Sequence, residues 1–425
     1  MTPRRTRSTA AARIPGRLWP ALVVAALWTT AQVLVASSGL PDELREQLAV
    51  WKNTLGIGFF LAAGLAFPGG LRPSRLALIA APFPLYATLR LGTGGDLTLI
   101  ALYVAWWWGF FVVVPAAFRD RTCYRRLVGW IVAAALLATT LGIVLGLLEG
   151  QVYWWDHERL VFSFTNPIYF AYGGLALAVG GFFLLPRKGR HARLVCSLLL
   201  GFGAAVVVGA RARNAMLFAV AFTLAYLTSG RRERLVSSVL LGVTFLAVAV
   251  AVGSQLDGRL DEISSGRLSL WETVISRNMG DMTTGEALFG VGGLEQTLLG
   301  SHDSVVAEAR FTRAHADNAY LDLFVSLGLT GLVLFLCPLV LVARDLLVGI
   351  ARYRQHDQLA RDLRAALATL AGLLAQGIVV SNLPSLGNLM NLLCMTLVMA
   401  VWGHVHRVDA IRVRATVPDP RRRPV

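Results

Sequence analysis

The sequence has few charged residues for a chain of 425 residues. Asp, Glu, Lys and Arg together make up 15% of it, whereas hydrophobic residues make up 56% and the mean hydropathy is +0.60. Apolar segments dominate the whole chain rather than forming one local patch, which is typical of a protein that crosses a membrane many times. The scarcity of charge therefore favours a polytopic membrane protein.

The chain also has only four cysteines, Cys123, Cys196, Cys337 and Cys394, and none lies in a segment expected on the outside of the membrane. Structural disulfides form in oxidising compartments, and cysteine metal sites need closely spaced ligands such as Cys-x-x-Cys. We therefore expect no disulfide framework and no cysteine metal site.

Acidic residues are scarce as well. The chain has 25 Asp and Glu residues but 40 Lys and Arg residues, which gives a net charge of +15. The basic excess occurs in short clusters between hydrophobic runs, which is the pattern of cytoplasmic loops rather than of a nucleic-acid surface. We predict no nucleic-acid partner and place these clusters in the cytoplasm. They lie at 4–17, 119–126, 187–193, 231–234, 344–364 and 407–423.

Hydrophobic windows predict an all-α bundle of about twelve transmembrane spans. The basic N-terminus could precede a secretion signal, but no small-x-small cleavage site follows, so we expect the first span to be retained. The spans are expected at 19–37, 54–71, 75–91, 97–118, 127–148, 167–185, 192–210, 213–229, 235–253, 317–343, 364–381 and 386–404.

This topology divides the chain into five parts and places both termini in the cytoplasm. A basic N-terminus (1–18) is followed by spans 1–9 (19–253) and by one large outside loop with a short amphipathic helix (254–316). Spans 10–12 (317–404) and a basic tail (405–425) complete the chain.

Polar residues stand at the mouth of the tenth span. On a 3.6-residue repeat, His315, Asn318 and Asp322 share one face. A charged side chain in a membrane segment costs about 2.5–3.5 kcal/mol on insertion scales, so it usually faces a partner or a water-filled cavity. Two interpretations remain open: a functional site, or a His315 and an Asp317 that only cap and flank the helix at the interface.

A pair of arginines breaks the charge rule. Arg211 and Arg213 lie in a very short gap that the alternation of spans assigns to the outside. The planar guanidinium group suits a phosphate or diphosphate, so one interpretation is an anion site. The other is that both side chains reach for lipid headgroup phosphates.

Two further arginines lie in outside segments. Arg267 follows Ser264 and Ser265, which can cap the short amphipathic helix, and it would point a cation at the outer cavity. Arg159 precedes Pro167, which opens the sixth span. It would either hold an anionic headgroup or sugar, or pair with neighbouring carboxylates.

Glycine and proline predict two local breaks. The glycine-rich segment 286–294 lacks a P-loop lysine and a preceding strand, so we predict a close turn packed on the membrane face rather than a nucleotide loop. Pro82 and Pro84 are expected to kink the third span.

The order of these motifs resembles the O-antigen ligase and O-antigen polymerase superfamily of bacterial membrane glycan transferases. The resemblance covers roughly residues 155–340. It rests on an Asn-Pro-opened helix after an Arg, an outside Arg before an apolar span, a Ser-Gly-Arg-x-x-x-Trp helix and a Phe-Gly-x-Gly turn. An Asn-x-Tyr-Leu stretch follows, with Gly-x-x-Gly-Leu inside the next span.

The resemblance implies transfer of a glycan from undecaprenyl diphosphate to an acceptor hydroxyl on the periplasmic side of the bacterial inner membrane, with inversion and with neither metal nor cofactor. The implied partners are the carrier-linked oligosaccharide donor, a glycan or lipid A-core acceptor, membrane lipids and a chain-length regulator. The site residues would divide into diphosphate-binding Arg211, Arg213 and Arg267, catalytic His315 and Asp317, and substrate-positioning Arg159, Asn318 and Asp322.

One departure from the family pattern concerns the base. The family has His directly before the Asn, whereas Asp317 stands there in this chain and His315 lies two residues earlier. Either residue can be the base, and the motifs leave both ligase and polymerase open. The rival hypothesis is a transporter or flippase whose outside arginines bind an anion. It is less favoured because the halves show no internal repeat and the ionisable residues cluster at one face.

Overall fold

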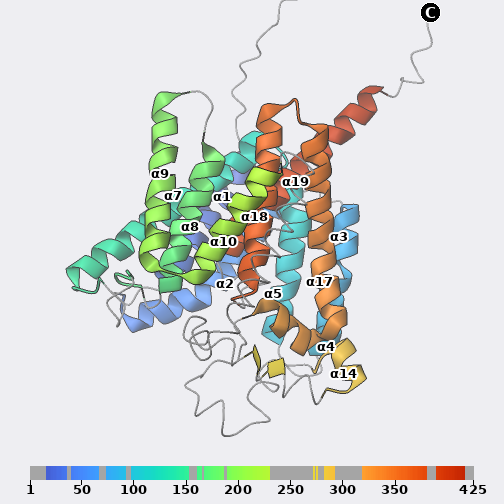
Figure 1. The fold of residues 1–425 in the computed structure, drawn as a ribbon, viewed down its shortest axis with the longest axis horizontal. Coiled ribbons are helices and arrows are strands. Elements are labelled where there is room, and N and C mark those ends of the chain that lie inside the picture. The colour runs from blue at the N-terminus through green and yellow to red at the C-terminus, as the bar shows by residue number, and fades with distance from the viewer. Residues whose placement is uncertain are drawn as a thin grey trace, which may run out of the picture.

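The computed structural model describes the chain as a bundle of helices (Figure 1). Nearly all described residues are helical and none of them lies in a strand, which confirms the all-α prediction. Apolar segments fold as helices because a helix satisfies its backbone polar groups within one segment. The described residues are 16–35, 40–66, 73–91, 97–152, 160–164, 167–185, 189–229, 271–272, 274–275, 282–291, 318–380 and 389–416.

The described helices follow one another along the chain, and several of them are separated only by a turn. A 3-10 turn, η1 (Gly16–Leu18), comes first, and the π-helical turn η2 joins α5 to α6. In chain order after η1, the elements are α1 (Trp19–Leu34), α2 (Asp42–Leu65), α3 (Arg75–Ala80), α4 (Pro82–Leu91), α5 (Leu97–Trp108), η2 (Gly109–Val113), α6 (Val114–Ala117), α7 (Arg121–Leu148), α8 (Pro167–Leu184), α9 (Arg190–Ala210), α10 (Arg213–Thr228), α14 (Thr284–Phe289), α17 (Ala319–Arg352), α18 (Asp357–Gly377) and α19 (Leu389–Thr416).

Six described helices are long and apolar enough to cross a membrane. The protein is therefore a helical membrane protein, although about twelve spans are not reached within the described residues. The ninth expected span, 235–253, lies outside them, and α18 carries four charged residues in place of a uniformly apolar surface. The six are Asp42–Leu65, Ile100–Ala117, Arg121–Leu148, Arg190–Ala210, Ala319–Arg352 and Leu389–Ile411.

Several helix ends differ from the hydropathy windows. The third expected span is broken between α3 and α4 directly before Pro82, as predicted. However, α2 begins at Asp42, α17 continues to Arg352, and α19 runs to Thr416 into the expected tail. Hydropathy finds only the apolar part of a helix, whereas hydrogen bonding continues into the polar interface. Asp42 lies in the first turn of α2, where the helix dipole favours a carboxylate.

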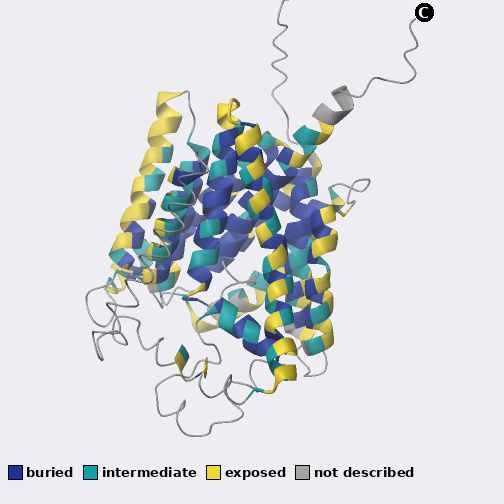
Figure 2. Cartoon of the chain, turned by 45° about the vertical axis from the view of Figure 1, so that its right-hand side comes forward, coloured by how far each residue is buried: buried dark blue, intermediate teal, exposed yellow. Residues whose placement is uncertain are grey.

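The centre of the bundle is α19 and its edge is α9. In their apolar stretches 83% of the α19 residues and 17% of the α9 residues are buried. Figure 2 shows the buried residues gathered in the middle of the bundle. Aromatic rings fill the space between neighbouring helices, such as Trp28 of α1 against Phe60 of α2 with ring centroids 5.9 Å apart. The apolar outer surface of α9 is the kind of surface that lipid covers.

Most described arginines gather at one end of the bundle, which we call the basic end. Here α7, α9 and α18 begin, and α8, α17 and α19 end. Contacts between these helices hold the end together: Arg121 Nε lies 2.7 Å from Asp362 Oδ2, and Arg352 Nη1 lies 2.6 Å from Asp409 Oδ2. At the other end, which we call the opposite end, α8, α10, α17 and α19 begin and α18 ends.

Candidate functional site

The turn between α9 and α10 presents two arginines at the opposite end. Arg211 ends α9 in the left-handed conformation, with φ 45° and ψ 35°, and its N–H donates to Val208 O at 3.1 Å. A side chain in this conformation costs roughly 1–2 kcal/mol, so such residues are often functional. Arg213 is the first residue of α10, and both side chains are exposed. The short gap predicted between the two helices is confirmed.

The residue after Arg213 anchors this turn in the bundle. Asn214 is 2% exposed, and its Nδ2 donates to Tyr172 Oη of α8 at 3.0 Å. Leu160 N donates to Gly209 O at 3.0 Å, which ties the segment 160–164 to the end of α9. The two arginines are therefore carried by a turn that hydrogen bonds fix from two sides.

The start of α17 differs from the predicted helical face. Asn318 has an extended backbone, with φ −143° and ψ 109°, and the helix begins after it. Its Oδ1 accepts from Tyr320 N at 3.0 Å and from Leu321 N at 3.1 Å. The prediction of one helical face through His315, Asn318 and Asp322 is therefore wrong at Asn318, because this residue caps the helix.

Asp322 lies in the first turn of α17 and faces the inside of the bundle. It is 7% exposed, its N–H donates to Asn318 O at 2.9 Å, and its backbone oxygen accepts from Ser326 Oγ at 2.6 Å. A carboxylate in this turn is stabilised by the positive end of the helix dipole. The expectation that Asp322 avoids lipid is confirmed.

The end of α18 lies between these two groups, because α18 packs against both α10 and α17. Tyr320 Oη donates to Leu374 O, which joins the start of α17 to the end of α18. Gln376 is 2% exposed, and its Nε2 has no hydrogen-bond partner among the described residues. Sequence reasoning missed Tyr172, Asn214 and Gln376, although an amide or phenol inside an apolar helix is a usable signal.

Inside α17 the helix is interrupted by Gly328, which has φ 67° and ψ −175°. A Cβ at Gly328 would lie 2.4 Å from Gly290 N, so the turn after α14 approaches the interrupted backbone too closely for any side chain. Val291 N donates to Val325 O at 3.0 Å. Of the described part of the predicted close turn, residues 286–289 belong to α14, and only 290–291 form a turn packed on α17.

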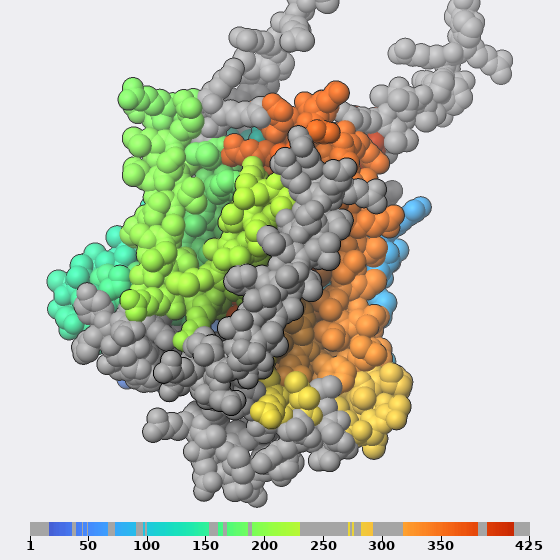
Figure 3. Space-filling view, viewed as in Figure 1, coloured from blue at the N-terminus to red at the C-terminus, as the bar shows by residue number. Residues whose placement is uncertain are grey.

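Two side chains of α4 fasten this turn. Tyr86 Oη lies 2.8 Å from Phe289 O and 2.9 Å from Leu327 O, so its one hydroxyl proton is shared between these two carbonyls. Arg90 Nε donates to Phe289 O at 2.7 Å. Figure 1 shows α14 beside α4 and the start of α17, and Figure 3 shows the yellow atoms of this region at the same end. The opposite end is thus built from backbone carbonyls and neutral donors as well as from arginines.

Residues before α14 also pack on α17. Trp271 and Val274 form a small apolar cluster with Val325, Leu321 and Phe324. An apolar stripe through Leu268, Trp271 and Ile275 was expected on the short amphipathic helix. Trp271 does pack on α17, but Ile275 is 50% exposed and Val274 is buried in its place, whereas Leu268 lies outside the described residues. The remaining predicted site residues lie outside the described residues: Arg159, Arg267, His315 and Asp317.

The predicted site residues that the structure describes lie at one end of the bundle in two groups. Arg211 and Arg213 stand at the α9–α10 turn, and Asn318 and Asp322 stand at the start of α17. The two groups flank the end of α18. An anion at the turn would meet two guanidinium groups and the backbone N–H groups that open α10.

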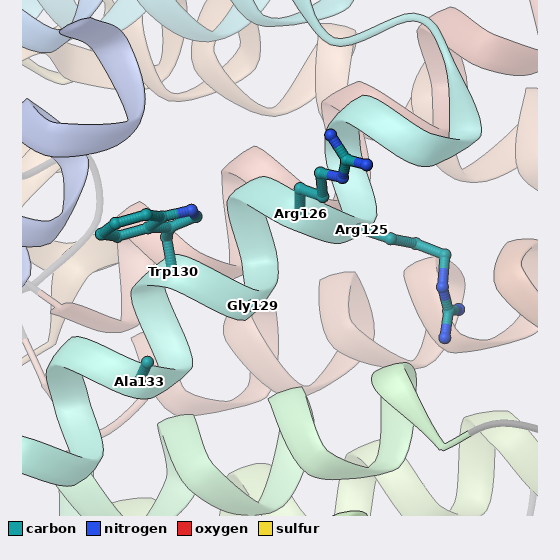
Figure 4. Close-up of a pocket in the computed structure, with 5 residues that line it drawn as sticks. All are labelled: Arg125, Arg126, Gly129, Trp130 and Ala133. Carbon is teal, nitrogen blue, oxygen red and sulfur yellow. The ribbon is translucent and has the colours of Figure 1, made fainter. Parts of the chain in front are cut away.

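A pocket of about 450 Å³ on α7 is no alternative site. Its five lining residues all belong to one helix, and Figure 4 shows Trp130 and Arg126 on one side with Arg125 turned away. Arg125 donates to Phe183 O and Leu184 O of α8 at 3.0 and 2.8 Å. A catalytic site needs groups from several elements, so this pocket is a notch in the helix surface.

Among the described residues, no three His, Cys, Asp or Glu side chains are grouped to hold a metal ion, and all four cysteines are free. No protein-family model matches the sequence, and no curated protein matches it.

Proposed function

We propose that this protein is a bacterial membrane glycan transferase of the O-antigen ligase and polymerase type. It moves a glycan from undecaprenyl diphosphate to an acceptor hydroxyl, and the reaction takes place at the opposite end of the bundle. The observation that carries the proposal is the fixed α9–α10 turn with Arg211 and Arg213, at the same end as Asn318 and Asp322.

The orientation follows from charge. Arginine clusters are retained in the cytoplasm during insertion, so the basic end faces the cytoplasm and the opposite end faces the periplasm. Both termini are then cytoplasmic, and the protein resides in the inner membrane. The glycan carrier reaches the site from the outer leaflet, and no nucleotide sugar is required.

The chemistry needs a group that stabilises the leaving diphosphate. When the bond between the anomeric carbon and the diphosphate oxygen breaks, negative charge grows on that oxygen. Arg211 and Arg213, with Arg267 from the outer loop, donate hydrogen bonds to it and lower the barrier. The acceptor oxygen forms the new bond from the other face, so the sugar is inverted. Its proton passes to His315 or Asp317 as the base.

The start of α17 positions the acceptor. The Oδ1 atom of Asn318 is used by the helix cap, so Nδ2 is its donor toward a sugar hydroxyl. Asp322 is buried one turn later and orients groups beneath the acceptor. Arg159, in the segment that precedes α8 in the sequence, binds the donor sugar or its phosphate.

The test uses the purified full-length protein with an undecaprenyl-diphosphate oligosaccharide and no membrane gradient. Growth of the glycan, detected by mass spectrometry, is the expected result. A second carrier-linked repeat unit and a lipid A-core acceptor are offered in parallel, and the one consumed identifies a polymerase or a ligase. If the oligosaccharide crosses vesicle membranes without any new glycosidic bond, the protein is a transporter and the proposal is wrong.

A further inference from the structure

A groove of about 950 Å³ opens at the basic end between α3, α6, α17 and α19. Its size matches pockets that hold small ligands, which measure about 300–1,000 Å³. It lies at the other end of the bundle from the glycan site, and its interpretation is independent of the proposed transferase activity. Its polar lining includes Arg75, Arg119, Arg344, Asp345, His406 and Arg407.

Two arginines of this groove have their charge available. Arg75 of α3 and Arg344 of α17 are exposed, and neither makes an ion pair or a side-chain hydrogen bond with another described residue. The other charges near them are largely engaged. Arg407 pairs with Asp120, and Asp345 Oδ2 accepts from Trp402 Nε1 at 3.1 Å and lies 3.2 Å from His406 Nε2. The groove therefore has a positive mouth.

The deeper part of the groove is apolar. Ile79 lies one turn beyond Arg75 on α3, and Leu341 lies one turn before Arg344 on α17, so both stand on the membrane side of the arginines. Phe111 and Val112 line the groove from η2. Ile79 is 44% exposed, which leaves apolar surface open to a neighbouring chain of methylene groups.

We propose that this groove binds an anionic phospholipid from the leaflet that the basic end faces. The phosphate lies between Arg75 and Arg344, and an acyl chain lies along Ile79 and Leu341. A guanidinium group binds phosphate through two parallel N–H donors, and basic pockets between membrane helices suit anionic headgroups. The apolar part of the groove favours a lipid over a soluble phosphate, because only a lipid contacts both the arginines and the apolar side chains.

The binding test is native mass spectrometry of the full-length protein in detergent with added phosphatidylglycerol or phosphatidylcholine. The wild-type protein is expected to retain one phosphatidylglycerol in preference to phosphatidylcholine. The double variant Arg75→Gln/Arg344→Gln is expected to lose affinity for it by about tenfold or more, since two charge-assisted contacts are removed. Size-exclusion chromatography confirms that each variant remains folded.

The matched control removes the same charge from the same end. Arg190 and Arg193 are exposed at the start of α9, outside the groove, so Arg190→Gln/Arg193→Gln is expected to retain the lipid. A third variant, Leu341→Trp, fills the apolar part while both arginines remain, and it is also expected to lose the lipid. Equal loss in the α9 control, equal retention of both lipids by the wild type, or displacement by inorganic phosphate would each overturn the proposal.

Discussion

The two ends of the bundle use polar groups in different ways. At the basic end, arginines meet carboxylates, as in Arg121 with Asp362 and Arg407 with Asp120. At the opposite end, many of the described contacts join amides, hydroxyls and backbone carbonyls, as in Asn214 with Tyr172. The difference indicates that many charged side chains at the basic end form ion pairs that hold helix ends together. At the opposite end even Arg90 and Glu286 form hydrogen bonds with neutral partners, and Arg211 and Arg213 lie exposed at the α9–α10 turn.

The largest expected effect concerns the ion-pair network of the basic end. Asp362 is 1% exposed and contacts Arg121, Arg125 and Tyr124, whose hydroxyl donates to Oδ2 at 2.7 Å. Asp362→Ala leaves two partly buried arginines without their carboxylate, so we expect a loss of about 3–5 kcal/mol in the free energy of unfolding.

Thermal unfolding in detergent measures this loss. Asp357→Ala, at an exposed position in the first turn of the same helix, is the control and should lose only about 0.3–1 kcal/mol, the size of an exposed helix-dipole interaction. If both variants unfold at the same temperature, the basic end is not held by its ion pairs and the contrast between the two ends is lost.

A smaller effect is expected where the opposite end depends on close backbone contact. Gly328→Ala would place a side chain on a backbone conformation that only glycine readily adopts, and its Cβ would clash with Gly290 N. We expect the free energy of unfolding to fall by about 1–3 kcal/mol or more. A Cβ at Gly129 of α7 would meet no atom within 4 Å. Gly129→Ala should therefore stabilise the helix by up to about 1 kcal/mol. Similar stabilities for the two variants would show that α17 is not interrupted at Gly328.

The cap of α17 should contribute less than these. Asn318→Ala is expected to cost about 1 kcal/mol, because Tyr320 N and Leu321 N lose their acceptor. Asn318→Asp keeps an acceptor oxygen at the helix N-terminus but removes the Nδ2 donor. It should retain stability and lower kcat if the amide positions the acceptor. Full activity in Asn318→Asp would remove Asn318 from the site while leaving its structural role intact.

The smallest effect concerns pH at α14. The carboxylate of Glu286 accepts from the backbone N–H and the hydroxyl of Thr283, and these hydrogen bonds lower the pKa of Glu286 below its usual value. Because the pKa of Glu286 is lowered in the folded state, the carboxylate stabilises α14 fully above the ordinary pKa of about 4.3. This stabilisation is lost as the pH falls through the lowered pKa of the folded state.

Hydrogen exchange of the Ala287 amide, which donates to Thr283 O at 2.9 Å, reports on this cap. The protection factor of this amide should fall as the pH drops below the ordinary pKa of about 4.3, and in Glu286→Gln it should not change with pH over the same range. Unchanged protection in the wild-type protein would mean that the cap does not hold α14.

The sequence predicted the features that depend on local pattern. Apolar runs located the helices, Pro82 located the break between α3 and α4, and Pro167 located the start of α8. The turn at Arg211 was predicted because two cations between apolar runs have no place in hydrocarbon. These signals are local, so they survive without knowledge of which helices are neighbours.

The features that depend on neighbours could not be predicted in this way. Asn318 fits both a helical face and a cap, and only the structure shows its extended backbone. Gly328 is compatible with an uninterrupted helix until Gly290 is placed against it. Asp362 lies just before the hydropathy window at 364–381, and its partner Arg121 lies far away in the chain, so this ion pair has no local signal.

The most direct test of the diphosphate site compares the rate of glycan transfer by Arg213→Ala with that by Arg126→Ala in the same purified assay. Arg126 is an exposed arginine at the basic end, so its variant controls for charge and folding. We predict that Arg213→Ala, and likewise Arg267→Ala, loses at least about 10²-fold in kcat, as expected for removal of a donor that stabilises developing charge. Arg126→Ala should keep its rate. Equal rates for the Arg213 and Arg126 variants would contradict a diphosphate site at the α9–α10 turn.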